Sequence, residues 1–208
     1  MPLEVMIAFS VASLLLALSP GPDNLFVLVH SALYGPKSGI IVIAGLCTGL
    51  FFHTTIVALG IATLFKNSSL AFMLLKVTGA LYLLYLSWNS FRASVKRTEN
   101  QEQRKITGFH LYRRGVIMNV TNPKVSIFFL AFLPQFTSAD YGSLLPQFFI
   151  LGALFIFSTI LVFGAISLFS SFLCKFVNGS ERAQKLMNRI AGTVFACIAL
   201  KLVITTKM

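Results

Sequence analysis

A short polar run breaks the first apolar segment of the chain: Ser19-Pro20-Gly21-Pro22-Asp23-Asn24. The segment around it, residues 5–29, is long enough to cross a bilayer as one helix. Two prolines remove backbone donors and a glycine weakens a helix further, so the run predicts a helix that is broken at membrane depth. Asp23 lies inside that break, and both a break and an acid are costly in a membrane. We therefore expect a functional site here.

The composition is typical of a polytopic helical membrane protein. Of the 208 residues, 56% are hydrophobic and 11% are charged, and the apolar residues form continuous runs. A membrane β-barrel would instead alternate apolar and polar residues along its strands. The net charge of +11 does not indicate nucleic-acid binding, because most Lys and Arg lie in short stretches between the apolar runs. We expect the lipid bilayer to be the partner of this surface, and no nucleic acid.

Six apolar segments are long enough to span a hydrocarbon core of roughly 30 Å. They cover residues 5–33, 38–65, 69–91, 111–133, 144–173 and 183–205. They predict an all-α protein with a single transmembrane domain over residues 1–208. The N-terminal stretch lacks the basic region and the cleavage site of a signal peptide, so we expect the first segment to be retained as a helix.

The charges in the connections orient the chain in the membrane. Basic residues concentrate in the loop 94–109, near residue 37 and between residues 175 and 189, whereas residues 134–143 contain no Lys or Arg. By the positive-inside rule, the loop 94–109 is predicted to be cytoplasmic, and both termini are predicted to lie outside.

A second polar run breaks the fourth apolar segment: Asn119-Val120-Thr121-Asn122-Pro123-Lys124. When Pro22 is aligned with Pro123, each break is followed by a half-helix rich in apolar residues. Three helices followed by three reverse the orientation of the second unit, which predicts a 3+3 inverted-topology repeat with broken helices 1 and 4. Repeat one covers about residues 1–93 and repeat two about residues 110–208, with the basic loop between them.

The two breaks have the chemistry of a binding site for a zwitterion. Pro22 and Pro123 suit the first position of a new half-helix, and oxygens of Ser19, Thr121 or Asn122 could accept from its unpaired N–H groups. Two helix N-termini that face one cavity would suit a carboxylate. This geometry is expected of a transporter for amino acids.

Asp23 could hold the ammonium group of a substrate, carry a proton that couples to transport, or pair with Lys124, its equivalent in the repeat. His53 lies near the middle of the second segment, at about the depth of the breaks. A proton relay and an inter-helix hydrogen bond are both open interpretations for it.

The two motifs resemble the signatures of the LysE/RhtB family of bacterial amino-acid exporters, in the LysE superfamily. The first motif continues as Leu25-Phe26-Val27-Leu28, and the second as Phe128-Phe129-Leu130-Ala131-Phe132-Leu133-Pro134-Gln135-Phe136. The stretch from Gly35 to Gly60, with His53, is also similar to the family, and the likeness covers nearly the whole chain.

The resemblance implies a six-helix protein of the bacterial inner membrane that exports amino acids or close derivatives by exchange for protons. Homoserine, threonine, leucine-like and basic amino acids are the substrate classes it suggests. The candidate substrate- or proton-binding residues are Ser19, Pro20, Gly21, Pro22, Asp23, Asn24, His53, Asn119, Asn122, Pro123 and Lys124. Neither a cofactor nor a metal site is expected. Glycine-bearing helix faces could support a homodimer.

Two other function classes compete with this prediction. A channel or a cation exporter of the same superfamily is one, although Cys47, Cys174 and Cys197 show no metal-ligand spacing and are interpreted as packing residues. An intramembrane enzyme, with Asp23 and His53 as acid and base, is the other, but no nucleophile accompanies them. We therefore expect a transporter and no catalytic residue.

Overall fold

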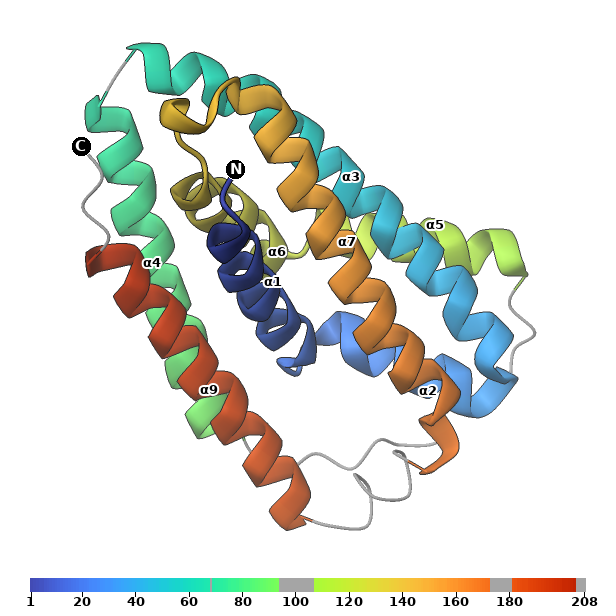
Figure 1. The fold of residues 1–208 in the computed structure, drawn as a ribbon. Coiled ribbons are helices and arrows are strands. Elements are labelled where there is room, and N and C mark those ends of the chain that lie inside the picture. Colours follow the sequence, from blue (N-terminus) through green and yellow to red (C-terminus); the bar gives the residue numbers. More distant parts are fainter. Residues whose placement is uncertain (68, 94–106, 173–180, 205–208) are drawn as a thin grey trace.

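The computed structural model describes residues 1–67, 69–93, 107–172 and 181–204, and all the regular secondary structure in that part of the chain is helical (Figure 1). The elements are α1 (Leu3–Leu18), α2 (Pro22–Tyr34), α3 (Pro36–Asn67), α4 (Ser69–Arg92), α5 (Gly108–Val120), α6 (Pro123–Ile127), η1 (Phe128–Phe132), η2 (Leu133–Phe136), η3 (Ala139–Tyr141), α7 (Leu144–Leu168) and α9 (Glu181–Ile204). Most of the predicted cytoplasmic loop, and Cys174, lie outside the described residues.

Helices long and apolar enough to cross a membrane confirm the class of protein. Three are single spans: Pro36–Gly60 in α3, Leu144–Leu168 in α7 and Gln184–Ile204 in α9. Two more are bent pairs, α1 with α2 and α5 with Pro123–Phe136. The described residues thus give three to five candidate spans, and the arrangement of six spans in two inverted units stays a prediction. The predicted third segment forms one continuous helix, α4.

Both predicted breaks are present. The first pair bends by 61° and the second by 48°. Proline explains each restart, because α2 begins at Pro22 and α6 begins at Pro123, where the missing N–H costs no helical hydrogen bond. After α6 the second half-helix continues as a wider π-turn, η1, and a tighter 3₁₀ turn, η2, instead of a regular α-helix.

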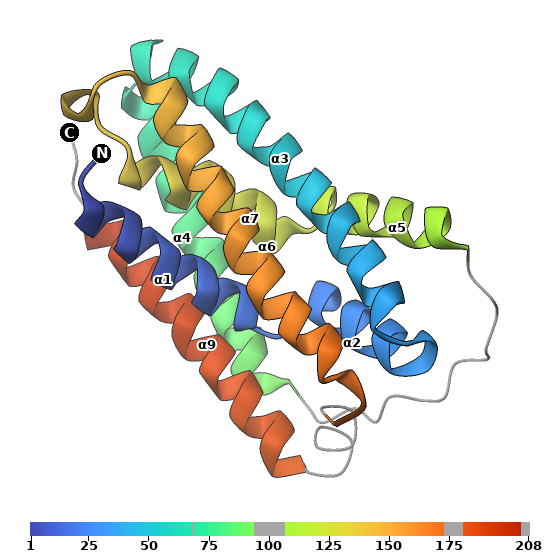
Figure 2. The ribbon, with the colours of Figure 1, turned by 45° about the vertical axis from the view of Figure 1, so that its right-hand side comes forward.

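The helices form a bundle in which segments far apart in the sequence lie side by side. Helix α4 packs along α9, while α3 packs along both α5 and α7 (Figures 1 and 2). Helix α1 lies between these two groups and contacts α7 and α9. The start of α1 and the end of α9 lie at the same end of the bundle (Figure 2).

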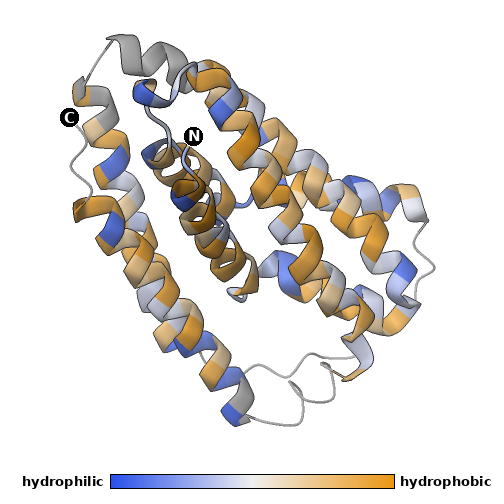
Figure 3. Ribbon diagram, viewed as in Figure 1, coloured by the Kyte–Doolittle hydropathy of each residue, from blue (hydrophilic) through white to orange (hydrophobic). Residues whose placement is uncertain are grey.

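Hydrophobic residues predominate along the described helices (Figure 3), and they lie both in the interior and on the outer surface of the bundle. A cluster of phenylalanines fills the centre, where Phe9 contacts Phe136 and Phe128 contacts Phe155, each pair with ring centroids 5.2 Å apart. Large apolar residues such as Leu81 and Leu200 are more than half exposed on the outside. So much exposed apolar surface fits contact with lipid.

Candidate functional site

The two breaks meet in the middle of the bundle. Asp23, in the first turn of α2, is 3% exposed, and Lys124, in the first turn of α6, is 7% exposed. Both side chains line a small cavity of about 20 Å³ together with Asn119 and Thr159. Apolar residues from both core clusters, among them Phe163, complete its wall. Asp23 and Lys124, which are 101 positions apart in the sequence, therefore line one cavity.

Asn122 connects the two breaks. Its side-chain Nδ2 donates to Asp23 Oδ2 at 2.8 Å, and its Oδ1 accepts from the backbone N–H of Lys124 at 3.0 Å. One amide therefore caps the start of α6 and holds the carboxylate at the other break. Of the three residues expected to supply a capping oxygen, Asn122 alone does so among the described contacts. The Thr121 hydroxyl instead bonds back to Ile117 in α5, because that residue still belongs to the last turn of α5.

Lys124 turns toward the end of α1. Its Nζ donates to the carbonyl oxygen of Ser19 at 3.1 Å and lies 3.5 Å from that of Leu16. The last carbonyls of a helix have no partner within it and carry partial negative charge, so an ammonium group is a suitable cap. Asn24 supplies a second donor there, from Nδ2 to the carbonyl of Ala17 at 2.7 Å. The broken end of α1 is thus satisfied by side chains of α2 and α6.

Gly21 permits this arrangement. A Cβ atom at position 21 would lie 3.0 Å from Lys124 Nζ, which is tighter than ordinary contact. The backbone there is extended, with φ of −165°, so the reason for glycine is the close approach of the ammonium group.

Asp23 and Lys124 do not form a direct ion pair. Among the described residues the only hydrogen bond to the Asp23 carboxylate comes from Asn122, and no oxygen of Asp23 lies within 4.0 Å of Lys124 Nζ. The direct pairing that the sequence left open is thus replaced by contact through Asn122 and by a shared cavity.

Four buried oxygens around the two breaks have no hydrogen-bond donor in this structure. They are Ser19 Oγ, Asp23 Oδ1, Asn24 Oδ1 and Asn119 Oδ1. A buried acceptor without a donor costs free energy, and native structures contain few of them. Two of these oxygens belong to Asp23 and Asn119, which line the cavity, so a group that enters it with hydrogen-bond donors could satisfy both.

The cavity is too small for an amino acid in this conformation. About 20 Å³ admits roughly one water molecule, whereas small-molecule sites measure about 300–1,000 Å³. A ligand of that size could reach Asp23 only if the surrounding helices separated.

His53 lies beside the site and does not line the cavity. Its Nε2 is 3.3 Å from the carbonyl oxygen of Asn119, so the ring links α3 to the end of α5, and it packs against Phe129. This is the inter-helix hydrogen bond that was one of its two interpretations.

Sequence reasoning missed the part of the wall that α7 contributes. Thr159, Phe155 and Phe163 line the cavity, and the Thr159 side chain is buried. The available signal was the pair Ser158-Thr159, which places two hydroxyl groups in the middle of a long apolar helix.

Comparisons with known proteins agree with the motifs. The family model described as LysE type translocator matches residues 14–206. The chain is 31% identical over 198 residues to the homoserine/homoserine lactone efflux protein of Salmonella typhimurium, covering 95% of each protein. It is also 31% identical to the homoserine/homoserine lactone efflux protein of Salmonella typhi, again over 95% of both chains. An uncharacterized membrane protein of Vibrio cholerae is 30% identical over 94% of both chains. A search of solved structures finds no significant match.

Proposed function

The chain belongs to the LysE type translocator family, and on that premise we propose that it exports homoserine, homoserine lactone or a related amino acid from the cytoplasm in exchange for protons. Membership makes this chain a translocator and not an enzyme, so the reading of Asp23 and His53 as a catalytic acid and base is set aside. The substrate class is suggested by the two Salmonella relatives, which are homoserine/homoserine lactone efflux proteins.

The observation that carries the proposal is the set of buried acceptors at the breaks. A protonated α-amino group brings three donors, and it matches a site where Asp23 Oδ1 and Asn119 Oδ1 lack donors. The carboxylate or carbonyl of the substrate would compete with the Ser19 carbonyl for the Lys124 ammonium group. Substrate binding would therefore loosen the contact that joins α6 to the end of α1.

Proton exchange follows from the same carboxylate. Ionised Asp23 holds the ammonium group of the substrate. A proton that enters from outside neutralises Asp23, and the substrate is then released. When Asp23 loses that proton on the cytoplasmic side, the site again accepts a cationic amine. The Asn122 amide can donate to either protonation state of the carboxylate and so keeps Asp23 in place through the cycle.

We place this site in an inverted repeat of six spans in the bacterial inner membrane, with the loop 94–109 in the cytoplasm and both termini outside. The two proline restarts, the two bends and the contact between Asp23 and Asn122 support the repeat. The basic residues of the loop support the orientation. A homodimer remains a prediction.

Counterflow in proteoliposomes tests the function. Purified full-length protein is reconstituted, and the flux of labelled homoserine is measured with and without a proton gradient. The gradient drives protons in the direction opposite to the homoserine flux. We expect saturable flux that the gradient accelerates. Flux that does not saturate would indicate a channel, and the absence of flux for homoserine, its lactone and all twenty amino acids would refute an amino-acid exporter.

A further inference from the structure

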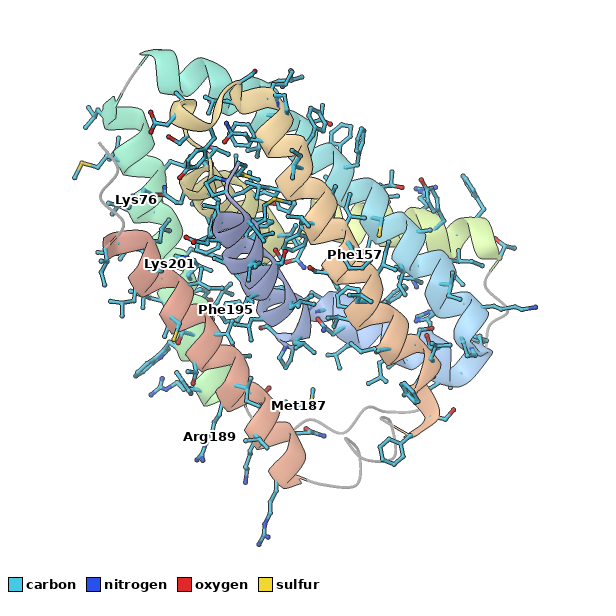
Figure 4. The ribbon with its side chains drawn as sticks, viewed as in Figure 1. Lys76, Phe157, Met187, Arg189, Phe195 and Lys201 are labelled. Carbon is cyan, nitrogen blue, oxygen red and sulfur yellow. The ribbon has the colours of Figure 1, made fainter. Side chains whose placement is uncertain are left out.

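A second and larger cavity lies where the start of α1 meets the end of α9. Its volume is about 320 Å³, and Glu4 and Ala8 of α1, Phe136 of η2 and Lys201 of α9 line it. Lys201 projects from the upper part of α9 (Figure 4). Residues Asp23 and Lys124 do not line this cavity, so it is distinct from the site at the breaks.

The lining of this cavity contains one acidic residue, Glu4, one basic residue, Lys201, and the aromatic rings of Phe132 and Phe136. Lys201 Nζ lies 4.5 Å from the centroid of the Phe136 ring and 6.0 Å from that of Phe132. This cation–π contact holds the ammonium group at the cavity, although the Lys201 side chain is exposed. The carboxylate of Glu4 lies in the same lining, and no hydrogen bond or ion pair within the described part of the chain engages it.

The size and the chemistry of this cavity fit a small zwitterion. Its volume is at the lower end of the range of about 300–1,000 Å³ for small-molecule sites, which suits a ligand no larger than an amino acid. An α-amino acid offers a carboxylate to Lys201 and an ammonium group to Glu4, while Val5, Ala8 and Leu202 supply an apolar wall for its side chain.

Aromatic rings separate this cavity from the inner one. Phe155 lines the cavity at the breaks, and Phe132 lines the cavity between Glu4 and Lys201. Phe128, in the π-turn, contacts both, with ring centroids 5.2 Å from Phe155 and 4.8 Å from Phe132. A substrate that leaves Asp23 on this side must therefore pass Phe128 before it reaches Lys201.

We propose that the cavity between Glu4 and Lys201 is a second subsite for the exported amino acid, which it occupies after passing Phe128. The inference rests on the proposed function, and it adds that this cavity distinguishes a free amino acid from its lactone. Lys201 recognises the carboxylate and Glu4 recognises the ammonium group. A free amino acid therefore uses both charges, whereas its lactone, which has no carboxylate, uses Glu4 alone.

Exchange in right-side-out membrane vesicles tests the subsite. The vesicles are loaded with unlabelled homoserine, and the initial exchange rate is measured against the external concentration of labelled homoserine or labelled homoserine lactone. The variants are Lys201→Met and Glu4→Gln. The control is Lys185→Met, which removes the same charge from an exposed position at the other end of α9.

We expect Lys201→Met to raise the external half-saturation concentration for homoserine about tenfold, as when a charge-assisted hydrogen bond is lost, with the maximal rate retained. The same variant leaves the lactone unchanged, whereas Glu4→Gln raises the value for both ligands. The subsite is refuted if wild-type protein exchanges homoserine and Lys201→Met behaves like Lys185→Met, or if it affects lactone and homoserine equally. Absence of saturable exchange in wild-type vesicles instead refutes the proposed function itself, and the subsite with it.

Discussion

The two helix breaks each restart at a proline but have opposite roles. The break between α1 and α2 presents acceptors: the carbonyl oxygens at the end of α1 and the carboxylate of Asp23. The break between α5 and α6 presents donors: the amide of Asn122 and the ammonium group of Lys124. The site is therefore assembled from two halves that satisfy each other, and neither break would be complete alone.

The two breaks share a geometry and differ in chemistry. Both restart at a proline, but aligned positions carry Asp23 in one half and Lys124 in the other. Their charges are opposite but not in direct contact, and under the proposed function each would bind one end of a zwitterion. Substitutions that make the breaks alike should remove this property.

The largest effect is expected when the acid of the first break is neutralised. Asp23→Asn keeps an oxygen that can accept from Asn122 but cannot take up a proton. We expect gradient-driven homoserine efflux to fall at least about tenfold, while expression and thermal stability change little. Efflux is measured in proteoliposomes. Gradient-driven transport at the wild-type rate would move the coupling to another residue.

Removal of the cation of the second break should destabilise the protein. Lys124→Met leaves the Ser19 carbonyl at the end of α1 without its donor and leaves Asp23 buried without a nearby positive charge. We expect a loss of about 2–3 kcal/mol, seen as a lower unfolding temperature in detergent, whereas the exposed control Lys185→Met has no effect.

A double-mutant cycle sharpens this result. Asp23→Ala combined with Lys124→Ala should cost less than the two single substitutions summed, because neither charge is then left buried alone. Strict additivity would mean that the two breaks act independently.

The two asparagines offer a matched comparison of smaller effects. Asn122→Ala removes a cap and a contact across the breaks, whereas Asn24→Ala removes one bond to the end of α1. We expect losses of about 2 kcal/mol and about 1 kcal/mol, respectively. The unfolding temperatures of the two variants, measured in the same detergent, test the order, and equal losses would contradict the bridging role of Asn122.

The smallest effect is expected at Gly21. In Gly21→Ala the new Cβ pushes on the flexible end of Lys124, so we expect a loss of about 0.5–1 kcal/mol. Gly164→Ala in α7 is the control, since nothing lies within 4 Å of its Cβ position and alanine favours a helix. If both variants have the same stability, the contact between Gly21 and Lys124 is not tight.

Much of the site could be read from local sequence. Proline in an apolar segment forces a break whatever surrounds it, so both restarts and their polar residues were predicted correctly. Thr159 was not predicted, because hydroxyl groups such as those of Ser158 and Thr159 in the apolar helix α7 look the same in the sequence whether they face lipid or the cavity.

The sequence by itself determined that this is a helical membrane protein, that two of its helices are broken, and that acid, amide and lysine lie at the breaks. Those properties follow from apolar length and from the missing N–H of proline, which act locally. The tertiary structure decided the partners: Lys124 caps α1, Asn122 holds Asp23, and Lys201 and Glu4 share an outer cavity. Partners depend on the bend angles and on how the π-turn of phenylalanines packs, and these are set by contacts between segments about one hundred residues apart.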